Sequence, residues 1–168
     1  MKKIALLLLL AGACAGSSPR PEGPEQAFET ERVHEAGQVR LWVPPAWAVD
    51  DSSGAMIMTA PDQSVSLSVS VLDGSDLGTA LLEVAGAALT GYDNIQLVGT
   101  PQGGQINGME ALFQDGRASY QGVPVELSVG VIDTPSDKFL LVVGEAESSA
   151  FPQHEATISK FMESIKPL

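Results

Sequence analysis

The sequence predicts an α+β domain built on a mainly antiparallel β-sheet of about six to seven strands, flanked by helices. Alternating apolar and polar residues, typical of half-buried strands, recur from residue 38 to residue 146. Two other segments repeat their apolar residues at helical spacing, one in the middle of the chain and one at its end. Short turn sequences join neighbouring strands, and connections of hairpin length favour antiparallel pairing.

Three strands are expected before the first helix. The first is Val39–Val43, which Pro44-Pro45 ends because proline lacks the amide donor of a strand ladder. The second is the short segment Ala55–Ala60. The third, Ser64–Leu72, alternates almost perfectly, with valine and leucine on one face and serine on the other. Its serine face is either covered by a helix or available to a partner.

The middle helix is expected to begin at Ser75 or Asp76 and to end at Gly91. Glycines inside it weaken it in isolation, so packing on the sheet must stabilise it. The closing helix opens at Pro152. The apolar faces consist of Leu77, Leu81, Val84, Ala85 and Ala88 in the first helix and Ile158, Phe161, Met162 and Ile165 in the second.

Between the two helices the pattern predicts about four strands. Asn107-Gly108 marks a tight hairpin, since both residues tolerate positive φ. Asp115-Gly116, inside the next strand, indicates a β-bulge, and Pro101–Gly104 is expected to be a loop. The expected strands are Ile95–Val98, Glu110–Tyr120, Val123–Asp133 and Phe139–Ala146.

The N-terminal residues are typical of an export signal. Two lysines precede the apolar run Ile4–Ala13, which is too short to cross about 30 Å of hydrocarbon as a helix. Leu10–Cys14 resembles the bacterial lipobox, and this resemblance implies cleavage after Ala13 and acylation of Cys14. The alternatives are an ordinary secretory signal cleaved elsewhere and an uncleaved anchor. Ala15 after the cysteine favours the outer membrane over the inner one.

The expected organisation is a lipoprotein signal peptide at residues 1–13, a lipid-anchored flexible tether at 14–37 and one domain at 38–168. The tether is rich in proline, serine and glycine and lacks apolar periodicity. The predicted location is the bacterial cell envelope, at the periplasmic face of the outer membrane. The N-terminal lipid is the expected contact with that membrane.

Charge and composition exclude several kinds of partner and cofactor. Lys+Arg is 9 and Asp+Glu is 21, so the net charge of -12 disfavours binding to nucleic acid. The single cysteine excludes an intrachain disulfide and a cysteine-based zinc cluster. Paired aspartates lie in turns, where aspartate caps backbone donors, and lack the spacing of a calcium loop. These pairs are Asp50-Asp51, Asp73 with Asp76, and Asp133 with Asp137. No metal or cofactor is expected.

The sequence contains no evident catalytic arrangement. A serine hydrolase needs a nucleophile elbow and a histidine in the folded domain, but the pattern G-x-S-x-G is absent. His34 lies in the expected tether, and His154 is expected on the exposed side of the closing helix. A hydrolase that uses His154 as its base is the least favoured hypothesis, and the chain is predicted not to be an enzyme.

Three short motifs resemble the PsbP-like fold, a superfamily that includes the plant photosystem II protein PsbP, a Ran-binding nuclear-import factor and bacterial envelope lipoproteins. They are Val43–Trp47, similar to a P-x-W opening, Ile106–Ala111, similar to I-N-G-x-x-A, and Ile158–Ile165, similar to a closing helix that ends in S-I. The usual form has glycine where this chain has Ala46. The resemblance covers residues 38–167. It implies an α/β/α sandwich that acts as a binding or assembly module without a shared catalytic site.

Trp42 and Trp47 are the candidate partner-binding residues, because tryptophan is enriched in interface hot spots. Packing inside the domain is the alternative for both. The leading hypothesis is a non-enzymatic, lipid-anchored envelope protein that binds a protein partner and serves as an assembly accessory module. The second hypothesis is a carrier of a small ligand or lipid, with a pocket between sheet and helix.

Overall fold

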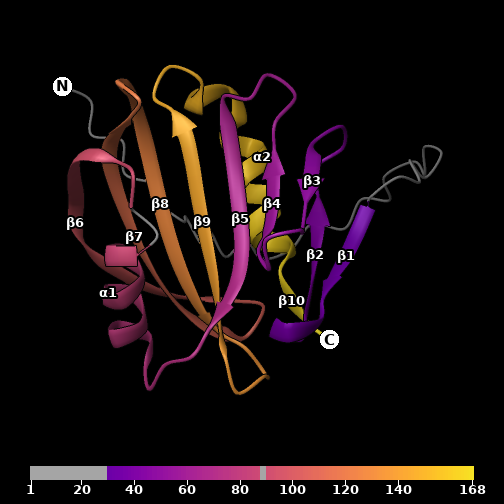
Figure 1. Ribbon diagram of the computed structural model, residues 1–168. Helices are drawn as coiled ribbons and strands as arrows, with labels where there is room; N and C mark the ends of the chain where they lie inside the picture. The colour runs from indigo at the N-terminus through magenta and orange to yellow at the C-terminus, as the bar shows by residue number, and fades with distance from the viewer. Residues whose placement is uncertain (1–29, 88–89) are drawn as a thin grey trace, which may run out of the picture.

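The computed structural model describes residues 30–87 and 90–168, which form two antiparallel sheets, two α-helices and a short 3-10 turn (Figure 1). The elements are β1 (Thr30–His34), η1 (Glu35–Gly37), β2 (Val39–Val43), β3 (Ala48–Asp50), β4 (Met56–Thr59), β5 (Val65–Leu72), α1 (Leu77–Ala87), β6 (Asp93–Ile106), β7 (Met109–Tyr120), β8 (Val123–Asp133), β9 (Phe139–Glu147), α2 (Phe151–Ser164) and β10 (Lys166–Pro167). The large sheet has the order β3-β4-β5-β9-β8-β7-β6, and the small sheet has the order β1-β2-β10. The predicted α+β class with a mainly antiparallel sheet of about six to seven strands is confirmed, and the large sheet has seven.

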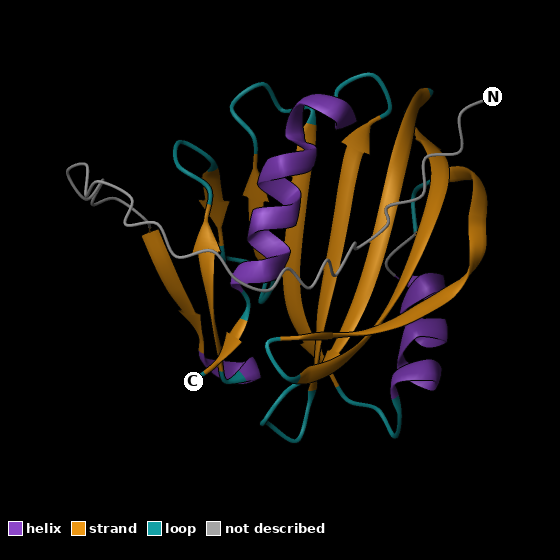
Figure 2. Ribbon diagram, turned by 180° about the vertical axis from the view of Figure 1, so that it is seen from behind, coloured by secondary structure: helices purple, strands orange, loops and turns teal. Residues whose placement is uncertain are grey.

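Each face of the large sheet carries one helix (Figures 1 and 2). Helix α2 lies on the face that holds the main core, where Phe161 and Ile165 are fully buried among residues of both sheets. Helix α1 lies on the opposite face and packs on β7 and β8. Because α2 also contacts β2, it joins the small sheet to the large one. Within the described residues, neither helix is long and apolar enough to span a membrane.

Strand β5 shows how sequence alternation places side chains on the two faces. Val65, Leu67 and Val69 are buried in the cores on the α2 side. Ser68 pairs with Val143 of β9, and Val143 packs against the cluster around α1, so the serines face the α1 side. They remain half-buried there, because the main contacts of α1 are with β7 and β8.

Three short strands, β1, β3 and β10, are absent from the sequence prediction because they are too short or too polar to show alternation. Strand β1 occupies residues 30–34, inside the segment 14–37 that was expected to be a tether, so the fold begins before residue 38. It pairs with β2 through backbone bonds along its whole length, from Thr30–Val43 to His34–Val39. The imidazole of His34 accepts a hydrogen bond from the amide of Gly37 and caps the 3-10 turn.

Strand β6 is continuous where the sequence predicts a short strand and a loop at 101–104. The irregularity lies inside the strand, because the register with β7 shifts between Val98 and Gln102. Gly99 lies in this interval with φ of 75°, a conformation that favours glycine. The predicted bulge at Asp115-Gly116 is therefore wrong: those residues pair regularly with β8, and the extra residues belong to the edge strand β6.

Two of the three sequence motifs meet at the C-terminal end of α2. The side-chain amide of Asn107, in the β6–β7 hairpin, donates to the carbonyl oxygens of Glu163 and Ile165 at 2.9 and 2.7 Å. The Ser164 hydroxyl donates to the carbonyl of Phe161 and accepts from the amide of Trp42 in β2 at 2.9 Å. These bonds satisfy groups that a helix end otherwise leaves unpaired, and they attach it to both sheets.

We predict that Phe161→Ala lowers the free energy of unfolding by about 3–5 kcal/mol, because a large side chain with 0% exposure is removed from the main core between the two sheets. Leu82→Ala on α1 is the control, since Leu82 is 74% exposed and its truncation should change stability by less than about 0.5 kcal/mol. Urea unfolding of both variants measures the difference. Equal losses in the two variants would contradict the assigned core.

The turn before Trp47 explains why the related motif carries glycine. Ala46 has φ of 65°, in the left-handed region, and its side chain is exposed. A residue with a Cβ atom pays about 1–2 kcal/mol there, whereas glycine does not.

We predict that Ala46→Gly raises the free energy of unfolding by about 0.5–1 kcal/mol, because relief of this strain exceeds the added entropy of the unfolded chain. The matched control is Ala48→Gly in β3, an exposed strand position at which glycine should destabilise by about 0.5–1 kcal/mol. Thermal and urea unfolding measure both changes. Destabilisation by Ala46→Gly would show that the turn is not strained.

Candidate functional site

Trp42, one of the two tryptophans predicted to bind a partner, is buried. Its side chain is 9% exposed and belongs to the main core. The ammonium of Lys160 lies 4.2 Å from the centroid of its ring, a cation–π contact that covers it further. The indole Nε1 is buried and has no hydrogen-bond partner among the described residues. A partner-binding role does not fit this burial, and Trp42 is a packing residue in this structure.

Trp47 is half-buried between two core clusters and contacts both. Its amide donates to the carbonyl of Pro44 at 3.2 Å, which closes the turn after β2. The ring meets the imidazole of His154 edge-on, with centroids 6.0 Å apart. Trp47 therefore links the start of α2 to the β2–β3 turn and leaves only part of its surface for a partner.

His154 does not point into solvent as the sequence predicts. Its side chain is 16% exposed, and its Nε2 lies 3.2 Å from a carboxylate oxygen of Asp62 and 3.4 Å from the hydroxyl of Ser64. A catalytic triad places the serine on one ring nitrogen and the carboxylate on the other. Here the same nitrogen faces both groups, so this geometry does not fit nucleophilic catalysis.

The turn aspartates hold their loops together. Hydrogen bonds from Ser52 lower the pKa of Asp50, and hydrogen bonds from Thr79 lower the pKa of Asp76 at the start of α1. Asp73 pairs with Lys138 at 2.7 Å. In the part of the chain that the structure describes, no three histidine, cysteine or acidic side chains gather where they could hold a metal ion.

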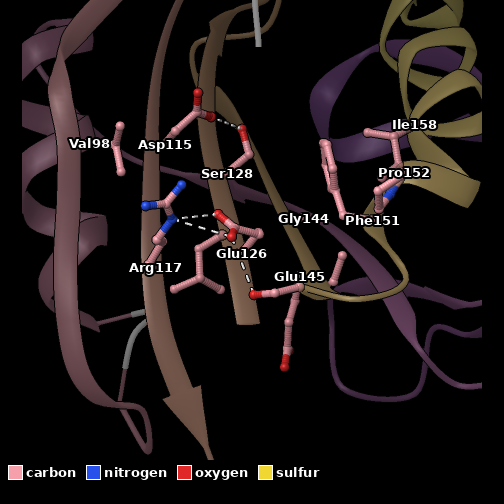
Figure 3. A pocket seen from close by; sticks show the side chains of 13 residues that line it. Val98, Asp115, Arg117, Glu126, Ser128, Gly144, Glu145, Phe151, Pro152 and Ile158 are labelled. Atoms are coloured by element: carbon pink, nitrogen blue, oxygen red, sulfur yellow. Dashed lines mark hydrogen bonds and ion pairs between the residues drawn. The ribbon is translucent and has the colours of Figure 1, made fainter. Parts of the chain in front are cut away.

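A partly open pocket of about 80 Å³ lies on the α2 side of the large sheet (Figure 3). Five elements contribute to it: β6, β7, β8, β9 and the first turns of α2. Figure 2 shows that α2 covers only part of this face and leaves much of β8, β7 and β6 without a helix. The second hypothesis from the sequence expects a pocket between sheet and helix, but the sequence does not indicate which residues line it.

The pocket combines apolar walls with a charged rim. Its main apolar side chains are Val98, Ala146, Phe151 and Ile158. The rim lies on β7 and β8, where the Asp115 carboxylate accepts a hydrogen bond from Ser128 at 2.9 Å. Beside it, Arg117 forms an ion pair with Glu126 at 3.1 Å, and the Ser148 hydroxyl donates to the same glutamate at 3.3 Å. Figure 3 shows these charged groups on one side of the pocket and Phe151 and Ile158 on the other.

Asp115 is the electrostatically unusual group of the rim. Partial burial is the main cause that raises the pKa of its carboxyl, and the charge of Glu126 raises it further. The hydrogen bond from Ser128 opposes both effects but does not cancel them. The surroundings of Asp115 in the folded protein therefore disfavour the charged form of its carboxyl.

Glu145 contributes to the pocket wall, but its side chain points away from the pocket (Figure 3). On the α1 face of the sheet it accepts a hydrogen bond of 2.5 Å from the hydroxyl of Tyr92, whose ring packs on Tyr120 at 5.3 Å. Burial and this bond raise the pKa of Tyr92 far above its ordinary value. This pair stabilises the opposite face and is not part of the pocket.

Cys14, the predicted lipid-attachment residue, and the signal peptide at 1–13 lie outside the described residues. The pocket residues went unrecognised because no local motif marks them. Asp115 and Arg117 alternate on the α2 face of β7, where the preceding positions of the same strand, Ala111 and Phe113, are apolar. A polar site there could have been indicated by one signal, namely two charged residues at positions of a long strand that face the core.

No family model matches the chain, and no curated protein matches it. Solved structures do share its fold. LpqN, involved in cell envelope biogenesis of Mycobacterium tuberculosis, has a TM-score of 0.59 and 18% identity over 82% of this chain and 88% of its own. Cyanobacterial PsbP (CyanoP) from Synechocystis has a TM-score of 0.61 and 12% identity over 94% and 98%. The Saccharomyces cerevisiae Ran-binding protein Mog1p has a TM-score of 0.53 and 13% identity over 80% and 93%. The chain therefore has the PsbP/Mog1-like fold, as the sequence motifs predicted.

We predict that Asp115→Asn stabilises the protein at neutral pH. A carboxyl whose pKa is raised by folding destabilises the fold once it ionises. The penalty is absent below the pKa of the unfolded state, grows as the pH rises from that value to the raised pKa of the folded state, and is constant above it. Asparagine is nearly isosteric and keeps an oxygen that can accept from Ser128. Urea unfolding should therefore give a larger free energy of unfolding for the variant at pH 7, with a difference that shrinks towards pH 3. A variant that is less stable at pH 7 would contradict this account.

Proposed function

We propose that this protein is a non-enzymatic, lipid-anchored accessory module of the bacterial cell envelope that binds a protein partner. Its similarity to LpqN, which is involved in cell envelope biogenesis, supports an envelope-related role. Its similarity to Mog1p, a Ran-binding protein, supports the use of this fold as a protein-binding module. The single Nε2 that faces both Asp62 and Ser64 supports a role without hydrolysis.

The size of the pocket is the observation that carries the protein-binding hypothesis. A space of about 80 Å³ is several-fold smaller than the roughly 300 Å³ at which sites for free small ligands begin. It suits one apolar side chain of a partner. Protein interfaces concentrate their binding energy in such anchors, which enter a small pocket and are surrounded by polar contacts. The apolar walls and charged rim of this pocket have that arrangement.

The lipid anchor completes this hypothesis. Acylation of Cys14 would hold the domain at the periplasmic face of the outer membrane, on a tether of about fifteen residues that ends at β1. Confinement to the surface raises the effective concentration of the module near a membrane-bound partner. A modest docking surface is then sufficient for stable association.

We predict that a photo-crosslinking amino acid in place of Val98 captures one partner protein in cells. Val98 lies on the pocket wall and is 41% exposed, so the probe reaches a docked partner without entering the core. The matched control places the same probe at Leu82, which is exposed on the opposite face. A Cys14→Ser chain, checked by intact mass for loss of the acyl groups, should give a weaker crosslink.

Equal crosslinking from positions 98 and 82, or none from position 98, would contradict the proposed docking site. Native mass spectrometry of the purified full chain distinguishes the protein-binding module from a carrier of a small ligand or lipid. The apolar lining of the same pocket is the observation that favours the carrier. A co-bound small molecule that is lost when Val98 is replaced by tryptophan would support the carrier. A mass that shows the acylated chain with no further bound molecule, together with a partner crosslink at position 98, supports the protein-binding module.

A further inference from the structure

The rim of the pocket carries more negative than positive charge. Arg117, its cation, is paired with Glu126. Asp115 accepts a hydrogen bond from the neutral hydroxyl of Ser128, and among the described residues no cation forms an ion pair with it. Figure 3 shows the carboxylate of Asp115 at the edge of the pocket, with one oxygen directed away from Ser128. One carboxylate at the pocket therefore lacks a positive partner.

The surrounding strands have the same charge. From residue 93 to residue 147, which includes β6 to β9, the sequence has eight acidic and two basic side chains. Both basic side chains are already paired with carboxylates, Arg117 with Glu126 and Lys138 with Asp73. A cation that approaches the pocket therefore meets a negative field, and an anion is repelled.

The remaining cations of the described chain lie elsewhere. Arg32, Arg40, Lys160 and Lys166 belong to β1, β2, the second half of α2 and β10. Figure 1 shows the small sheet at the far side of the molecule from β6, β7 and β8. The positive groups of the small sheet are thus separated from the pocket by the large sheet. The ammonium of Lys160 lies over the ring of Trp42 in β2 of that small sheet. None of these cations forms an ion pair with Asp115 among the described residues.

We infer that the pocket receives an apolar side chain of a partner protein that has a lysine or arginine next to it, and that this cation pairs with Asp115. This inference rests on the proposed function and names the chemistry of its partner. The apolar side chain fills the space between Val98, Phe151 and Ile158. The adjacent cation reaches the rim, where docking removes water and strengthens the charge pair.

An anionic partner group fits the same rim poorly. The guanidinium of Arg117 already directs its Nε towards both carboxylate oxygens of Glu126, at 3.3 and 3.1 Å. A carboxylate or phosphate that approached the remaining nitrogens would also approach Asp115 and Glu126. Like charges placed together at an interface weaken binding, so this arrangement selects against acidic partners.

Selection from a displayed library of random linear peptides tests this inference with the full chain in detergent as the target. We expect enriched peptides that share an apolar residue next to lysine or arginine. Asp115→Asn should weaken the binding of these peptides about tenfold and reduce its dependence on salt. The control Asp93→Asn, at an exposed acid of β6 outside the pocket, should change binding less than about twofold.

A second pair of variants tests the apolar wall. Val98→Ser should weaken binding, whereas Ile95→Ser should not, although both residues are 41% exposed on β6.

The outcomes separate this inference from the proposed function. Peptides that depend on Val98 but contain acidic or only neutral flanking residues would overturn the cationic partner and leave the docking pocket standing. Peptides that bind the Val98→Ser and Ile95→Ser chains equally well would overturn the pocket as the docking surface. A library in which no peptide is enriched on the wild-type chain over the Val98→Ser chain would also overturn the pocket as the docking surface. The crosslink from position 98 in cells remains an independent test of the proposed function.

Discussion

The packing of Phe161 between the two sheets is the contact on which the rest of the structure depends. The small sheet has three short strands and little core of its own, so it needs the apolar face of α2 to stay folded against the large sheet. Asn107 and Ser164 fix the end of the helix with hydrogen bonds to backbone groups of α2 and β2. The hairpin, the closing helix and the first strand of the domain therefore form one unit.

The position of α2 also creates the pocket. The C-terminal half of α2 packs with Ala111 and Ile132 at one end of β7 and β8, and the rest of these strands lies beyond the helix. Phe151 and Ile158, nearer the start of α2, form one wall of the pocket. The uncovered half of the sheet carries polar rim residues instead of a continuous core. Asp115 is part of that rim, where burial raises the pKa of its carboxyl, and a polar group in surroundings that disfavour its charge is typical of a functional site.

Local patterns were sufficient for much of the fold. The alternation of β5 and the Asn107-Gly108 turn predicted their elements correctly, because period-two burial and positive φ are properties of the local sequence. The sequence left packing of Trp42 as an alternative to partner binding, because Lys160, whose ammonium lies over its ring, is remote along the chain. The same holds for the pocket, which five elements form together and which no single segment indicates.

Native-state hydrogen exchange measures most directly whether α2 unites the two sheets. The amides of Trp42, which donates to Ser164, and of Phe161 should exchange with the same opening free energy as the amide of Val142 in the centre of the large sheet. That result would show that the helix and the small sheet open only when the whole domain unfolds. Much faster exchange at Trp42 and Phe161, with Val142 still protected, would show that α2 opens by itself and would contradict this account.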